Sequence, residues 1–338
     1  MRRATGVLVV AAVLAVAGGN LAVGSAAASA RHIPRHRAMA TYEWHNASAL
    51  PAAEVRRRLS FLRANGFRKV YLELGDYLEA ADQPPGSPGR QERLKAIRRA
   101  IRRYVATATS LGLAVHAVGG APTWIGELSY LGRLLVRLVG RYNAGVGAKE
   151  RLRGVQLDIE PYTDPSFFED EQASFADYLA TLNSIVRTYR SLRARHANRR
   201  LQLGFAIPFW FDAEGGPPGP VRFKGASKPV AWHIIDMVRS LRRAYLVVMS
   251  YRNFTDGPNG SIAHARSELE YARSIRARCG LVVGQQYGDV EPPYITFHGY
   301  SRRVFRKAAD AITKAFRRYP QFRGLSVDDL DGYMAASP

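Results

Sequence analysis

The sequence predicts an α/β fold, a (β/α)8 TIM barrel whose last helix is missing or replaced by a short tail. Short apolar runs alternate with longer helical patterns, which is typical of βα units around a parallel sheet. The alternation gives eight strands, and residues 31–338 suffice for such a barrel with insertions. The 338-residue chain is 47% hydrophobic and 23% charged, which excludes a disordered protein. An open doubly wound sheet is the alternative, but no glycine-rich phosphate motif follows the first strand.

Residues 1–30 have the pattern of a signal peptide. Arg2 and Arg3 supply positive charge, residues 6–18 are apolar, and Ala28-Ser29-Ala30 resembles a cleavage site. The apolar core is shorter than the roughly 20 residues of a membrane-spanning helix, and an uncleaved anchor is the alternative. We therefore expect a secreted or periplasmic protein with one barrel domain, residues 31–338, and no later membrane-spanning segment.

Eight segments have the apolar, β-branched character of strands, and several of them alternate apolar and polar residues. Because successive side chains on a strand point to opposite faces, this alternation also predicts which residues face the barrel axis. The predicted strands are 39–45, 69–75, 113–119, 154–160, 201–209, 245–251, 281–287 and 324–328.

Helical patterns fill the gaps between these strands. The first has Asn46 or Ser48 available as a cap and Gly66 as a stop signal. The chain ends ten residues after Asp328, which leaves little room for an eighth helix. The predicted helices are 51–65, 91–110, 128–143, 169–196, 231–241, 262–278 and 301–318.

The chain is strongly basic, with 49 Lys and Arg against 28 Asp and Glu and a formal charge of +21. Such an excess is typical of a solvated surface or of attraction to an anionic cell-wall or extracellular glycan. No known nucleic-acid-binding motif accompanies it, so we expect no specific nucleic acid partner. The single cysteine, Cys279, excludes an intramolecular disulfide, and no histidine spacing fits a zinc site, so we expect no metal or other cofactor.

Two carboxylates mark the end of the fourth strand, where barrel active sites lie. If Val155, Leu157 and Ile159 face the helices, then Gln156, Asp158 and Glu160 face the barrel axis. Two acids confined in a partly buried cleft raise one another's pKa, which is what a general acid requires. The sequence therefore predicts catalytic roles for Asp158 and Glu160.

The same alternation predicts that further polar side chains point toward the barrel axis at the mouth. It points Glu73, Tyr251 and Asp328 inward from the second, sixth and eighth strands, and Gln286 lies at the end of the seventh. The first strand is ambiguous, because either Tyr42 and Trp44 or Glu43 and His45 could point inward.

Three tryptophans, Trp44, Trp124 and Trp210, lie at or just after predicted strand ends. Aromatic rings around a carboxylate-rich pocket suit sugars, whose C–H faces stack on indole, although such rings also serve as packing. We expect these three rings, together with Glu73, Gln156, Gln286 and Asp328, to contact a carbohydrate.

The segment 153–160 resembles the fourth-strand signature of family 18 glycoside hydrolases, the chitinases and their relatives, D-G-x-D-x-D-x-E. Gly154, Asp158 and Glu160 match it, whereas Arg153 and Gln156 replace its first two aspartates. Met249-Ser250-Tyr251 resembles the family's sixth-strand M-x-Y motif. The likeness is distant: it covers the fold and about a dozen residues, and the tryptophan usual in the family's eighth strand is missing.

The resemblance implies that Glu160 protonates the glycosidic oxygen, that Asp158 orients the substrate's acetamido group for attack on the anomeric carbon, and that Tyr251 polarises that group. Gln156 cannot share a proton as an aspartate would, so a substrate without an acetamido group is the alternative. In that case Asp328 or Glu73 could supply the second carboxylate. We expect a secreted glycoside hydrolase; the alternative is a non-catalytic glycan-binding or cell-wall-binding barrel that has lost part of the motif.

Overall fold

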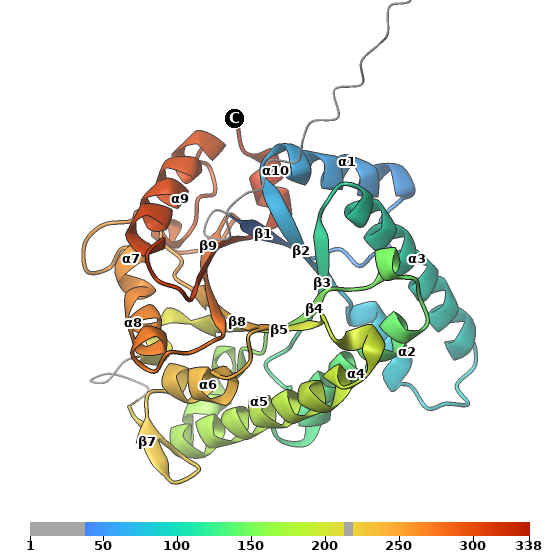
Figure 1. Ribbon diagram of the computed structural model, residues 1–338, viewed down its shortest axis with the longest axis horizontal. Helices are drawn as coiled ribbons and strands as arrows, with labels where there is room; N and C mark the ends of the chain where they lie inside the picture. The colour runs from blue at the N-terminus through green and yellow to red at the C-terminus, as the bar shows by residue number, and fades with distance from the viewer. Residues whose placement is uncertain (1–37, 213–218) are drawn as a thin grey trace, which may run out of the picture. The chain divides into compact units, whose positions relative to one another are not determined.

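The computed structural model describes residues 38–212 and 219–338, and within them eight parallel strands close into a barrel (Figure 1). This confirms the predicted fold class. The predicted signal peptide lies outside the described residues. Around the barrel the strand order is β1-β10-β9-β8-β5-β4-β3-β2, so neighbours in sequence are neighbours in space except for a separate hairpin. The barrel strands are β1 (Met39–Glu43), β2 (Phe67–Glu73), β3 (Ala114–Gly119), β4 (Gly154–Leu157), β5 (Gln202–Pro208), β8 (Ala244–Met249), β9 (Gly280–Gln286) and β10 (Phe322–Asp328).

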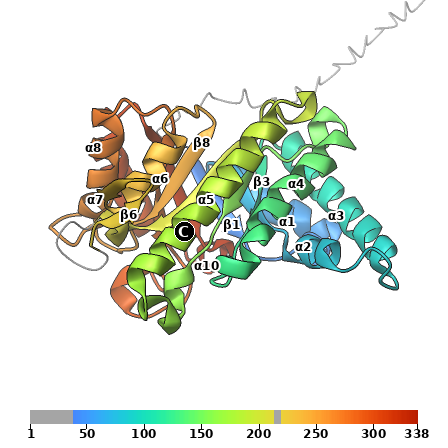
Figure 2. The same cartoon turned by 90° about the horizontal axis from the view of Figure 1, so that it is seen from below.

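Helices surround the barrel, and α5 runs across its flank (Figure 2). All seven predicted helices are present, with shifted ends. The stretch predicted as 262–278 divides into α7 and α8 at Ala265. Among the described residues no helix is both long and apolar enough to traverse a bilayer. The helices are α1 (Ala52–Ala64), α2 (Gly75–Asp82), α3 (Arg90–Ser110), α4 (Tyr130–Ala144), α5 (Glu171–Arg193), α6 (Val230–Val238), α7 (Ser261–His264), α8 (Arg266–Ser274), α9 (Arg302–Phe316) and α10 (Leu330–Ala335).

Three elements were not predicted from the sequence. Helix α2 follows β2 directly, and the hairpin of β6 (Val221–Phe223) and β7 (Ala226–Lys228) lies between β5 and α6. The chain's last segment forms the six-residue helix α10, which is the short replacement expected for an eighth barrel helix.

Two apolar layers hold the barrel together, one between strands and helices and one inside the strands. The outer layer takes the side chains of one strand face, such as Val155 and Leu157, because these positions point at the helices. The inner layer is smaller and carries several tyrosines: Ala40, Tyr42, Tyr71, Val118, Tyr245, Val247 and Val282. The outer layer fixes the strands, and the inner layer forms the floor beneath the mouth at their carboxyl ends.

Candidate active site

The end of β4 presents its side chains as the alternation predicts. Val155, Leu157 and Ile159 are buried in the outer layer, so the intervening side chains turn to the barrel axis. The Asp158 amide donates to the Gly119 carbonyl at 3.1 Å, which continues the β3–β4 pairing past the strand end. A Cβ at Gly120 would lie 1.8 Å from the Asp158 carbonyl oxygen, so only glycine permits this close approach.

Glu160 is half-buried at the mouth, where a 3-10 turn (Pro161–Thr163) begins. The hydroxyl of Tyr162 donates to its Oε2 at 2.8 Å, and Tyr162 meets Trp210 edge to face with ring centroids 5.0 Å apart. Burial raises the pKa of Glu160, the Tyr162 hydrogen bond lowers it, and the charge of Asp328 raises it further. The balance favours a larger protonated fraction than an exposed glutamate has.

Asp158 lies deeper than Glu160. Burial raises its pKa well above the ordinary value, and the charges of Glu160, Asp328 and Glu73 raise it further. Its Oδ1 is covered and has no hydrogen-bond partner among the described residues. A buried oxygen without a partner is costly, so this atom is available to a ligand or to a proton.

Asp328 is held at the end of β10 by donors from three other strand ends. Trp44 Nε1 donates to Oδ1 at 2.7 Å, Gln286 Nε2 donates to Oδ2 at 3.0 Å, and the Tyr251 hydroxyl lies 3.4 Å from Oδ2. Burial raises the pKa of Asp328, while the hydrogen bonds from Trp44 and Gln286 lower it. Tyr251, Gln286 and Asp328 therefore meet where the sequence placed them, facing one centre.

The ambiguity of the first strand is settled in favour of Tyr42 and Trp44. Tyr42 belongs to the inner layer, and Trp44 stacks on it with ring centroids 5.2 Å apart. Glu43 instead points outward, where it is fully buried and paired with Arg58 of α1 at 2.5 and 2.8 Å. Trp44 remains 40% exposed, so one face of its ring is open at the mouth.

Glu73 and Trp124 line a separate cavity of about 300 Å³ between the ends of β2 and β3 and helices α2 and α4. Burial raises the pKa of Glu73 to about 7, and its charge acts on Asp158. Trp124 is only 7% exposed and packs in the outer layer, with its ring close to Gly119. Helix packing covers most of this indole, and its contact with a sugar stays a prediction.

Gln156 lies below the surface of the mouth, and its contact with a carbohydrate stays a prediction. It faces the barrel axis but is fully buried, where its Nε2 donates to the Tyr42 hydroxyl at 3.3 Å. It lies against Gly204 of β5, one layer below Asp158, and so supports the floor of the site.

Tyr42 and Tyr162 are the two contributors that sequence reasoning did not assign to the site. Tyr162 follows Glu160 by two residues, and that spacing across a proline turn was the available signal. Among the residues described, no three His, Cys, Asp or Glu side chains are grouped in a way that would hold a metal ion.

Comparisons with protein-family models and with curated protein sequences found no match. Solved structures do match. The chain is similar to glycoside hydrolases of several families. A family 5 enzyme from Prevotella bryantii B14 aligns at a TM-score of 0.51 and 10% identity, over 86% of this chain and 87% of that one. An endo-β-1,4-mannanase from Thermotoga petrophila aligns at 0.51 and 11%, over 87% and 67%.

The likeness to family 18 is more distant. A family 18 chitinase from Cycas revoluta aligns at a TM-score of 0.43 and 14% identity, over 87% of this chain and 95% of that chain. At such identities a structural likeness establishes the barrel fold, and the same fold carries many activities. What distinguishes this barrel from others of the same fold is therefore the set of side chains at its mouth.

Proposed function

We propose that this protein is a secreted glycoside hydrolase in which Glu160 is the general acid. The observation that carries the proposal is the convergence of three carboxyl groups, Asp158, Glu160 and Asp328, on Tyr251. Asp328 Oδ2 lies 3.4 Å from the Tyr251 hydroxyl, and burial, followed by the charges of Asp328, Asp158 and Glu160, raises the pKa of that hydroxyl. Partly buried acids with raised pKa values beside aromatic rings suit the protonation of a glycosidic oxygen.

The roles follow from the surroundings of each group. Tyr162 engages Glu160 Oε2, so Oε1 is the oxygen that presents the proton to the glycosidic bond. As the C–O bond breaks, the leaving sugar keeps that proton, and the Glu160 carboxylate then accepts a proton from the attacking water. Asp158 lies deeper and acts as the orienting and electrostatic partner of the reacting sugar ring.

The mouth also supplies surfaces for sugar rings. Trp44 offers its open indole face, and Trp210 lies beside Tyr162 at the opposite strand ends. Gln286 holds Asp328, which faces Tyr251 across the mouth. We assign Trp44, Trp210, Tyr251 and Asp328 to substrate binding, with Glu73 acting on Asp158 through its charge.

The test is a Glu160→Gln variant beside a matched Glu169→Gln control, since Glu169 is exposed nine residues further along the chain. Assayed by release of reducing ends from a panel of polysaccharides, Glu160→Gln should lose at least about a hundredfold in turnover, because a general acid contributes that much. It should still bind the same polysaccharide, and Glu169→Gln should match the parent.

Full turnover in Glu160→Gln would overturn the assignment of the acid. Binding of a polysaccharide by the parent protein without release of reducing ends from any member of the panel would favour a non-catalytic glycan-binding barrel. Gln156 is the observation that supports this second function. It is buried, and its amide replaces an aspartate of the family 18 pattern.

A further inference from the structure

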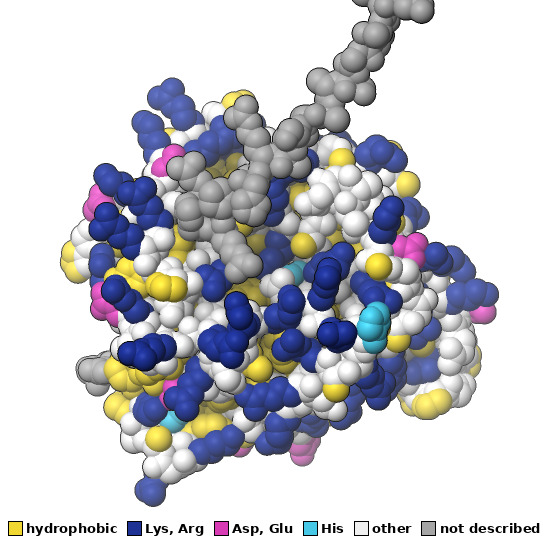
Figure 3. All heavy atoms as spheres, viewed as in Figure 1, with side chains coloured by type: hydrophobic (Ala, Val, Ile, Leu, Met, Phe, Trp, Pro, Cys, Tyr) yellow, Lys and Arg dark blue, Asp and Glu magenta, His cyan; other side chains and the backbone are white. Residues whose placement is uncertain are grey.

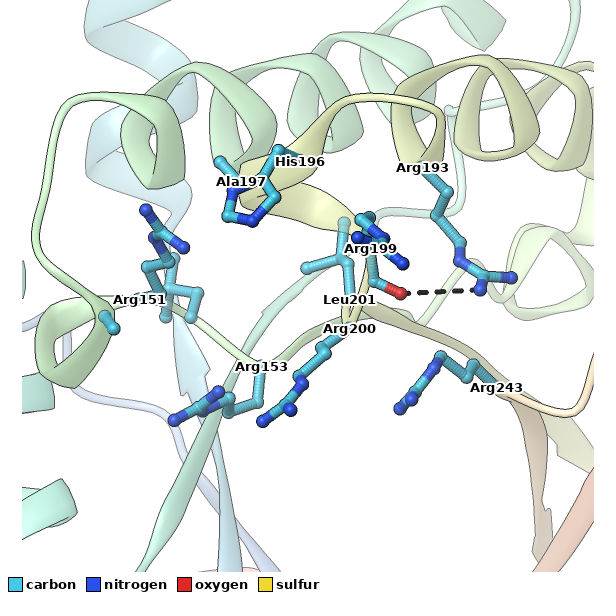
Figure 4. A pocket seen from close by; sticks show the side chains of 11 residues that line it. Arg151, Arg153, Arg193, His196, Ala197, Arg199, Arg200, Leu201 and Arg243 are labelled. Atoms are coloured by element: carbon cyan, nitrogen blue, oxygen red, sulfur yellow. Dashed lines mark hydrogen bonds between the residues drawn. The ribbon is translucent and has the colours of Figure 1, made fainter.

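We infer that the opposite face of the barrel, where the strands begin, is a binding site for an anionic polysaccharide. This goes beyond the proposed activity and uses none of its residues. The site is a pocket of about 630 Å³, which we call the arginine pocket. Its lining contains no Asp or Glu and includes six arginines, shown in Figure 4: Arg151, Arg153, Arg193, Arg199, Arg200 and Arg243.

The backbone brings three of these arginines together. Arg153, Arg200 and Arg243 precede β4, β5 and β8, which are neighbours in the barrel. The Arg153 carbonyl accepts from Gln202 and the Arg243 carbonyl accepts from Leu203, so the sheet itself fixes their positions. Adjacent strands lie only about 4.8 Å apart, which places like charges side by side on rigid supports.

These charges are not neutralised within the described part of the chain. None of the six arginines forms an ion pair with a described Asp or Glu, and the Nε of Arg193 is covered without a partner. The polar contacts that do form are weak or local, such as Arg193 donating to the Arg199 carbonyl at 3.4 Å (Figure 4). Crowded, unpaired guanidinium groups repel one another, and a bound anion would relieve that repulsion.

Two further grooves extend the positive surface from the pocket. One lies between α4 and α5 and the other between α3 and α4, and Arg141 lines both of them. Leu192 of the first groove directly precedes Arg193 of the arginine pocket at the end of α5, so α5 contributes to both depressions. Figure 3 shows Lys and Arg side chains spread across the face with few acidic ones. The grooves contribute seven arginines, Arg98, Arg99, Arg102, Arg137, Arg141, Arg187 and Arg195.

The chemistry of the lining favours an anionic glycan. Guanidinium groups make paired hydrogen bonds to sulfate, phosphate and carboxylate groups. Tyr142 is buried, so the three linings offer a single exposed aromatic ring, that of His196, whereas a strand of nucleic acid bases is bound by stacking on several rings in succession. A chain with anionic groups repeated along its length matches guanidinium groups distributed over the pocket and both grooves.

The experiment measures binding of the full chain to dextran sulfate, with uncharged dextran and duplex DNA as the other ligands. The variant is Arg200→Gln/Arg243→Gln, and the control Arg303→Gln/Lys307→Gln removes the same charge from exposed positions of α9. All four positions are exposed, so both proteins should unfold at the parent temperature.

The pocket variant should bind dextran sulfate about tenfold more weakly than the control variant, because two specific contacts are lost. The logarithm of the binding constant decreases with the logarithm of the salt concentration. In the pocket variant the magnitude of this slope should be smaller by about 1.4–1.8, which corresponds to two released counterions. Equal weakening in both variants would overturn the site in favour of net charge alone. Binding of DNA more tightly than dextran sulfate, with loss in the pocket variant, would overturn the glycan and assign the pocket to nucleic acid.

Discussion

Asp328 illustrates how single residues define the mouth of this barrel. Its carboxyl group is largely buried, yet three donors from three other strand ends point at its oxygens. Hydrogen bonds to a carboxylate stabilise the charged form, whereas burial destabilises it. The Trp44 indole contributes the shortest of the three contacts, 2.7 Å, and so has the greatest influence on the charge of Asp328.

Replacing Trp44 by Phe should raise the pKa of Asp328, because the variant keeps an aromatic ring over Tyr42 but loses the donor. The pKa can be followed by carbon-13 NMR of the carboxyl groups, with Asp328 identified through an Asp328→Asn variant. Trp232→Phe is the control, since that indole stacks on Tyr271 among the outer helices. An unchanged Asp328 titration in Trp44→Phe would show that the indole does not stabilise the carboxylate.

At the scale of elements, a buried ion-pair cluster ties the short last helix to the rest of the barrel. Arg58 of α1 pairs with the fully buried Glu43 of β1 and reaches Asp331 of α10 at 2.6 Å. His45 adds a contact to Glu43 at 2.9 Å. Because Trp44 lies between Glu43 and His45, the cluster also sets the position of an aromatic ring of the proposed site.

Arg58→Met should lower the free energy of unfolding by about 3–5 kcal/mol, because it leaves Glu43 buried without its cation. Asp331→Asn should cost less than about 1 kcal/mol, since that carboxylate is half exposed. Urea unfolding of both variants measures the difference. A double variant Glu43→Gln/Arg58→Met should recover part of the loss, and equal costs for the two single variants would contradict this account.

The contrast between predicted and observed elements has a physical cause. The eight strands were predictable because burial on one or both faces leaves a local apolar pattern, and the same alternation turned Asp158, Glu160 and Asp328 inward. The hairpin of β6 and β7 has three residues per strand, too few to show a period. Whether Glu43 or Trp44 faced inward depended on Arg58, a partner 15 positions away that no local pattern reveals.

Depth within the site could not be predicted from the strand pattern either. Alternation gives the direction of a side chain, but helix packing and the layer below decide whether it reaches solvent. Trp124 is covered by the outer layer, and Gln156 is enclosed beneath Asp158. Both side chains have the right chemistry for a sugar contact, and tertiary packing rather than the strand pattern decides how far each is exposed.

At the scale of the whole molecule, the two ends of the barrel carry titratable groups of different kinds. Carboxyl groups lie at the mouth, where the strands end. Arginines lie on the face where the strands begin, and Lys and Arg side chains are spread across that face in Figure 3. Between them the interior holds Lys69, whose Nζ lies 4.2 Å from the centre of the Tyr245 ring. Burial lowers the pKa of Lys69 to about 7 and also lowers that of the neighbouring His116.

The state of Lys69 makes the stability of the barrel depend on pH. Between about pH 7 and its ordinary pKa of 10.5, the folded protein holds Lys69 mostly neutral while the unfolded chain binds the proton. The unfolded state then carries more protons, so Lys69 makes the free energy of unfolding rise with pH across this range. Lys69→Met removes that contribution, so its free energy of unfolding should change less with pH than that of the parent between pH 7 and 10.

Urea unfolding at pH 7, 8, 9 and 10 measures both curves, with the exposed Lys95→Met as control. Parallel curves for the parent and Lys69→Met would mean that the folded barrel leaves this ammonium group as well solvated as water does.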